Sequence, residues 1–129
     1  MSTPFEALGG EPGVRALTET FYDHMDAHEP AIAHLHVIDP NGAVSRESRD
    51  RFALFLVGWL GGPQTYSEVH GHPRLRLRHG RVPIDGAARD AWLRCMTAAM
   101  DQHDVAGEVR LLLDARFAEV AEMLRNRAG

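Results

Sequence analysis

The sequence has little cysteine and no long hydrophobic run, and both features narrow the class of protein. Cys95 is its one cysteine, which excludes an intramolecular disulfide and favours a reducing compartment. The first residues, Met-Ser-Thr-Pro, lack the basic segment followed by an apolar run that marks a secretory signal. The apolar stretch 52–60 is too short and too amphipathic to span a bilayer. These features predict a cytoplasmic protein that does not contact a membrane.

Excess positive charge is also absent. The net charge is −4 at pH 7, whereas nucleic-acid-binding proteins gain affinity by concentrating Lys and Arg, so no nucleic-acid partner is expected. Hydrophobic residues make up 44% of the chain and charged residues 25%, which is typical of a folded globular protein. The length of 129 residues suits one domain, 1–129, with a core large enough to enclose one ligand.

No strand pattern of convincing length is present, and the apolar residues instead follow helical spacing. Apolar residues three or four positions apart predict helices around 14–25, from near Ser45 to Leu60, after Asp85, and over 106–125. A short helical turn is expected at 4–8, before the break at Gly9 and Gly10. Asp85 and Asp104 are the expected N-caps of the last two helices. The last helix is predicted to bury the stripe Val109, Leu112, Leu113, Phe117, Val120, Ala121 and Leu124.

A polar stretch at 63–83 separates the second and third of these helices. A connection of this length without a long helix usually carries function. Its segment 74–79 either mimics a strand or forms two helical turns that place Leu75 and His79 on one face. Its alternating arginines suit the binding of carboxylates or form a solvated face.

The chain contains eight histidines, and several interpretations of them are possible. The pairs His34/His36 and His70/His72 suggest zinc, but a structural zinc site needs four N or S ligands at tight spacing. His79 taken alone fits a surface or hydrogen-bonded histidine as well as an iron ligand. Tyr22 and Trp92 are equally open: each is either a core residue with a satisfied polar group or a hydrogen-bond donor in a ligand cavity. Periodicity predicts only that both are substantially buried.

Longer motifs in order along the chain resemble the group II truncated haemoglobins. The resemblance covers nearly the whole chain and depends on Gly9-Gly10, Phe21-Tyr22 and the segments 60–63, 66–68, 70–73, 78–79 and 90–96. It implies an all-α truncated globin, in which two pairs of antiparallel helices cross in a two-over-two sandwich around haem b. A haem-free helical binding module, with the aromatic residues as plain core, is the alternative outside this family.

The resemblance also implies roles for individual residues. His79 matches the proximal histidine that ligates the iron, and Arg78 matches a residue that pairs with a haem propionate. Tyr22, Trp92 and His36 match polar residues on the distal side, where the ligand binds. Ser48 matches a small residue of the distal helix that leaves ligand entry open, and Phe52 lies one turn further on. The remaining expected haem contacts are Phe55, Tyr66 and Leu75.

Together these features predict a globin that reversibly binds O₂, CO and NO at a pentacoordinate iron. Haem-based redox chemistry, as an NO dioxygenase or a peroxidase-like enzyme, is the alternative. Because the chain has no reductase domain of its own, sustained turnover would require an external reductase. The sequence is compatible with a monomer or a homodimer.

Overall fold

The computed structural model describes residues 2–72 and 82–128, and these residues are predominantly helical. The only bridge between extended segments in the described part is an isolated antiparallel pair, Ile38 and Val44, so the all-α prediction is confirmed. The helices are α1 (Pro4–Ala7), α2 (Gly10–His28), α3 (Pro30–Ala33), α4 (Arg46–Trp59), α5 (Thr65–His70), α7 (Gly86–Gln102) and α8 (Gly107–Leu124).

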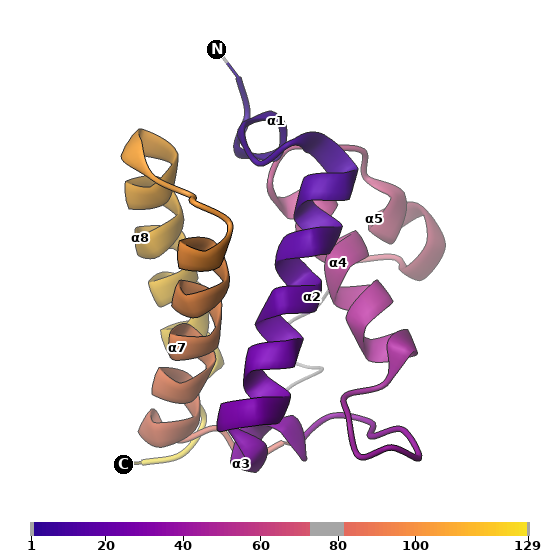
Figure 1. Ribbon diagram of the computed structural model, residues 1–129, viewed down its shortest axis with the longest axis vertical. Helices are drawn as coiled ribbons and strands as arrows, with labels where there is room; N and C mark the ends of the chain where they lie inside the picture. Colours follow the sequence, from indigo (N-terminus) through magenta and orange to yellow (C-terminus); the bar gives the residue numbers. More distant parts are fainter. Residues whose placement is uncertain (1, 73–81, 129) are drawn as a thin grey trace.

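The long helices form two antiparallel pairs (Figure 1). One pair consists of α2 and α4, and the other of α7 and α8. Helix α2 also packs against α7, so it joins the two pairs at the centre of the molecule. The short helices α1, α3 and α5 lie at the ends of the long ones (Figure 1). This arrangement is the predicted two-over-two sandwich.

The ends of the long helices follow local sequence signals. Ser45 accepts a hydrogen bond from the backbone N–H of Ser48 at 3.2 Å and begins α4. Asp85 accepts one from the backbone N–H of Ala88 at 2.8 Å and begins α7. Both starts confirm the prediction, because each side-chain oxygen satisfies an N–H that lacks a partner in the first turn.

Asp104 does not cap α8, and that prediction was wrong. The N-cap is Ala106, which offers no side-chain hydrogen bond. Asp104 instead adopts φ 56° in the turn between α7 and α8, a left-handed conformation that aspartate tolerates better than most residues. The same property that makes Asp a good cap, a short polar side chain, also makes it a turn residue.

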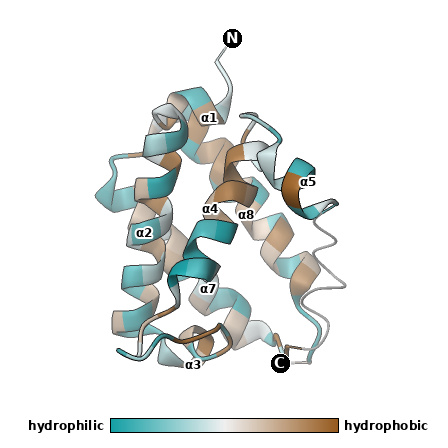
Figure 2. Cartoon of the chain, turned by 90° about the vertical axis from the view of Figure 1, so that its right-hand side faces the viewer, coloured by the Kyte–Doolittle hydropathy of each residue, from teal (hydrophilic) through white to brown (hydrophobic). Residues whose placement is uncertain are grey.

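The core lies where the long helices face one another. The predicted inner face of α2 is confirmed, because Val14, Leu17, Phe21 and Met25 are each at most 1% exposed. On α8 the prediction was partly wrong, because Leu112 is 43% exposed. Consecutive helical residues are rotated by about 100°, so with Leu113 directed into the core, Leu112 points sideways into solvent. Figure 2 shows the resulting mixture of hydrophobic and hydrophilic turns along α8.

Cys95 lies in this core and is fully buried. Burial raises the pKa of its thiol to about 12, so the thiol stays protonated and unreactive at neutral pH. Across the two described ranges, no helix combines the length and apolar character needed to cross a membrane.

Candidate functional site

A cavity of about 470 Å³ opens between α7, α8 and the connection that follows α3. Its walls are mainly aliphatic. Three of the predicted distal residues, His36, Ser48 and Trp92, line it from three different segments. The other lining residues are Ile32, Leu35, Val37, Val82, Ile84, Ala88, Arg89, Val120, Ala121 and Leu124. The volume lies within the range of small-molecule sites, roughly 300–1,000 Å³.

Ring contacts join the remaining predicted residues to this cavity. The ring of Tyr22 meets that of His36 edge-on, with centroids 5.5 Å apart, and that of Phe52 at 5.8 Å. Phe52 in turn meets Trp92 at 6.3 Å. Aromatic pairs at these separations and tilts contribute beyond the area they bury. Tyr22 and Phe52 are not among the cavity-lining residues, so they lie one ring contact behind its wall.

The same cluster of rings continues along α4 to α5. Phe55 lies three residues after Phe52 on one helical face, and the two rings stack at 6.4 Å. Phe55 also meets Tyr66 of α5 at 5.8 Å. Six predicted residues from five segments therefore form one connected aromatic cluster. Sequence reasoning assigned Phe21 to the core only, yet its ring contacts Tyr22, Phe52 and Trp92 and fills the centre of the cluster.

Tyr22 is a buried residue with a protonated hydroxyl. The residue is 4% exposed, and burial raises the pKa of its hydroxyl above the ordinary tyrosine value. Within residues 2–72 and 82–128, neither this hydroxyl nor the indole N–H of Trp92 hydrogen-bonds any group. Polar groups of buried residues normally have partners, and neither of these two donors has one among the described residues. Trp92 is half-buried, less than expected from periodicity.

His36 is oriented by its own helical turn. Its Nδ1 lies 2.9 Å from the carbonyl oxygen of Ile32, and because a carbonyl can only accept, Nδ1 carries the hydrogen. In the neutral ring Nε2 is then an acceptor, and only the imidazolium form donates from both nitrogens. His36 therefore differs chemically from Tyr22 and Trp92, which donate in their neutral forms.

Sequence reasoning missed Arg51, a cation beside the aromatic cluster. Its guanidinium lies over the ring of Tyr66, 6.0 Å from the centroid. Its Nε is buried and has no hydrogen-bond partner in the described part of the chain. An unpaired buried donor on a charged group is costly and points to a missing acceptor. The only signal in the sequence is an arginine directly before Phe52, inside an apolar stripe.

The predicted proximal residues Leu75, Arg78 and His79 lie outside the described residues. Their predicted roles therefore remain predictions. Val82, the first described residue after these three residues, lines the cavity.

Comparison with known proteins assigns this architecture to a family. The model of the bacterial-like globin family matches residues 3–126. The chain is 36% identical over 126 residues to the group 2 truncated hemoglobin YjbI of Bacillus subtilis, covering 98% of this chain and 90% of that protein. The chain belongs to the group II truncated haemoglobins. It is therefore a haem-binding globin.

Solved structures of this family share the fold over nearly the whole chain. The group II truncated hemoglobin from Bacillus anthracis has a TM-score of 0.90 and 36% identity, covering 100% of this chain and 95% of that one. The group II 2-on-2 hemoglobin from Agrobacterium tumefaciens has a TM-score of 0.88 and 38% identity, with coverage of 100% and 97%. The truncated oxygen-avid haemoglobin from Bacillus subtilis has a TM-score of 0.86 and 38% identity, with coverage of 97% and 100%.

The described residues of this globin fit a haem. A flat apolar macrocycle with two carboxylates needs aliphatic and aromatic walls and cations at its edge. The cavity supplies the walls, and the unpaired Nε of Arg51 supplies a donor that lacks an acceptor. Arg89 also lines the cavity, although Asp90 at 3.0 Å and Glu122 at 2.5 Å already occupy its guanidinium. Arg51 is not among the residues that line the cavity, but its Nε has no acceptor in the described part of the chain.

Proposed function

We propose that this globin reversibly binds O₂, and also CO and NO, through a pentacoordinate haem whose one protein ligand is His79. The observation that carries this proposal is a pair of donors without a hydrogen-bond partner among the described residues, the hydroxyl of the buried Tyr22 and the indole N–H of Trp92. Bound haem supplies an iron with an axial position open to a diatomic molecule. The relative from Bacillus subtilis that is described as oxygen-avid supports the choice of O₂.

The haem is expected to be haem b, held without a covalent bond to the protein. Covalent attachment of c-type haem uses a Cys-x-x-Cys-His motif. This chain contains one cysteine, Cys95, which is fully buried in the helical core. Extraction with acidified organic solvent should therefore release all of the haem from the protein. The reduced state of this thiol also supports the cytoplasm as the working compartment.

Each of the chain's own residues has a defined task in this proposal. Arg78 and Arg51 bind the carboxylates of the haem, and the rings of Phe55 and Tyr66 pack beside it together with Leu75. On the other side, Tyr22 and Trp92 donate hydrogen bonds that slow ligand escape. Ser48 leaves room for ligand entry because its side chain is small. The larger Phe52, one turn further along α4, restricts the space available to the ligand.

Absorption spectroscopy of the purified protein tests the proposal. We expect an intense Soret band that shifts on reduction with dithionite and again on addition of CO, which requires an open axial position. A colourless protein that stays folded and rejects added haem would overturn the proposal. With O₂, a complex that persists for many minutes supports reversible binding. A complex that is consumed on addition of NO or peroxide supports redox catalysis with an external reductase instead.

Loss of the Arg51 guanidinium is expected to weaken haem retention. Arg51→Gln removes a charged hydrogen bond to a carboxylate, which is worth about 2 kcal/mol, so haem should leave roughly 30-fold faster. Transfer of haem to an excess of apomyoglobin measures the rate. Arg94→Gln is the matched control, because Arg94 pairs with Glu29 at 2.7 Å on the exposed surface. Equal rates in both variants would exclude Arg51 from haem binding.

A further inference from the structure

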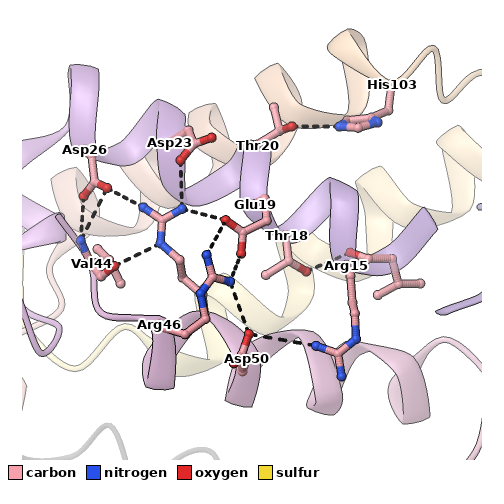
Figure 3. A network of polar contacts seen from close by, with 12 residues as sticks. Arg15, Thr18, Glu19, Thr20, Asp23, Asp26, Val44, Arg46, Asp50 and His103 are labelled. Carbon is pink, nitrogen blue, oxygen red and sulfur yellow. Dashed lines mark hydrogen bonds and ion pairs between the residues drawn. The ribbon is translucent and has the colours of Figure 1, made fainter. Parts of the chain in front are cut away.

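Arg49 is a buried arginine at the centre of an ion-pair network. It joins α4 to α2, the helix that carries Tyr22. It is 6% exposed, directly follows Ser48 and precedes Phe52 by three residues on α4. Its side chain is directed to α2. Nη1 donates to Glu19 at 3.0 Å and to Asp23 at 2.8 Å, and Nη2 donates to Asp26 at 2.6 Å. Figure 3 shows these three carboxylates converging from α2.

The guanidinium also holds the connection that carries His36. Its Nε donates to the carbonyl oxygen of Val44 at 2.9 Å. Asp26, one of its partners, accepts from the backbone N–H of Val44 at 3.1 Å, as Figure 3 also shows. The backbone N–H and carbonyl of Val44 therefore both hydrogen-bond to the ion pair between Arg49 and Asp26. This fixes the end of the connection that leads from α3 through His36 to α4.

The charge of Arg49 is retained despite its burial. Burial alone would lower the pKa of the guanidinium, but the hydrogen bonds that it donates to Asp23 and Glu19, together with their negative charges, raise the pKa above the ordinary value. A buried charge in a protein must be paired in this way. The planar fork of arginine is needed for it, because a lysine ammonium cannot reach separate acceptors on both sides with fixed geometry.

The network is centred on Tyr22. Its three carboxylates come from positions 19, 23 and 26, which lie on the helical turns directly before and after Tyr22. The carbon of the Arg49 guanidinium lies over the tyrosine ring, 5.6 Å from its centroid, within the range of a cation–π contact. The ion pairs of Arg49 therefore fix how α2 is rotated and shifted along its axis relative to α4. They thereby fix the position of the Tyr22 hydroxyl.

We propose that Arg49 is a positioning residue that orients the Tyr22 hydroxyl toward the ligand and thereby sets the rate of ligand release. It does not touch the ligand. This inference rests on the proposed function, in which Tyr22 donates to the ligand. It adds that the strength of that donation is determined by an ion-pair network whose guanidinium lies over the tyrosine ring.

Arg49→Lys is the central test, because it keeps the charge and removes the fork. We expect O₂ to dissociate about three- to tenfold faster, which corresponds to a weakened but not abolished hydrogen bond. In a Tyr22→Phe background the same change should have no further effect, since the group it acts through is gone. A full acceleration in that background would show that Arg49 acts by another route and would overturn the proposal.

Arg46→Lys is the matched control. Arg46 lies on the same helix and pairs with the same Glu19 and with Asp50 at 3.2 Å, but its side chain is 64% exposed. It should leave the O₂ dissociation rate unchanged. If Arg49→Lys does not fold, Asp23→Asn loosens the guanidinium from its most exposed partner, which is 70% exposed. That variant should accelerate O₂ release in the same direction.

A spectroscopic readout separates positioning from a general loss of stability. The chain contains two tyrosines, so ring-labelled tyrosine in the diamagnetic CO complex gives signals from Tyr22 and Tyr66 only. Arg49→Lys should move the Tyr22 signals and the CO stretching frequency, and leave the Tyr66 signals in place. A variant that is less stable but has unchanged Tyr22 signals and O₂ release would overturn the positioning role. A wild-type rate that Tyr22→Phe itself leaves unchanged would instead contradict the proposed function.

Discussion

Replacing His79 by glycine should abolish stable haem ligation. His79 is the proposed protein ligand to the iron, so its loss leaves the haem held by apolar contacts and carboxylate pairing alone. We expect purified His79→Gly to lose most of its Soret absorbance, and the remaining band to change shape. Addition of free imidazole should restore the wild-type spectrum, because it fills the space left by the side chain and supplies the same nitrogen donor.

The matched control for this experiment is His34→Gly. His34 is exposed on the surface, so its removal should leave the spectrum unchanged with or without imidazole. If His79→Gly keeps a wild-type spectrum, the ligand is a different residue. His36 would then be the first candidate, because it is the one histidine among the residues that line the cavity in the described part of the chain.

The long helices were predictable because their signals are local. The inner face of α2 repeats every three to four residues, and Ser45 and Asp85 cap the first turns of α4 and α7. The failures have local causes too. Leu112 belongs to an apolar run on α8. Its burial depends on whether another helix packs against it, and the sequence of α8 alone does not contain that information. Aspartate is a residue type common at N-caps, but Asp104 adopts a left-handed turn conformation instead.

The polar part of the site was less predictable than its aromatic part. Tyr22, Phe52 and Trp92 could be named from the sequence, through helical spacing and the family resemblance. Arg49 could not, because its acceptors on α2 lie 23 to 30 residues away along the chain. Burial of an arginine depends on such distant carboxylates, whereas burial of an aromatic ring follows from its own hydrophobicity. Arg51 was missed as well, because the sequence does not reveal that its Nε is buried without a hydrogen-bond partner in the described part of the chain.

Removing both neutral donors should have the second large effect, on ligand release. One hydrogen bond between neutral groups is worth about 1 kcal/mol, roughly a fivefold change in rate. Tyr22→Phe and Trp92→Phe should therefore each accelerate O₂ dissociation by about that factor, and together by about 25-fold or more. Stopped-flow mixing of the O₂ complex with excess CO measures the rate. Thr20→Val is the control, because it removes from α2 a neutral hydroxyl that pairs with His103 on the exposed surface.

The pH dependence of the same rate distinguishes the donors from one another. Burial raises the pKa of Tyr22 above its ordinary value near 10, so its hydroxyl stays a donor and its contribution should be constant from pH 6 to pH 10. His36 donates from Nε2 only as an imidazolium, since Nδ1 is already committed to the carbonyl of Ile32. Slower O₂ release at acid pH that disappears in His36→Gln would therefore assign a third, conditional hydrogen bond to His36. A double variant of Tyr22 and Trp92 with the wild-type rate would show that hydrogen bonds from these two residues do not control ligand release. Access past the cavity wall at Ser48 would then control it.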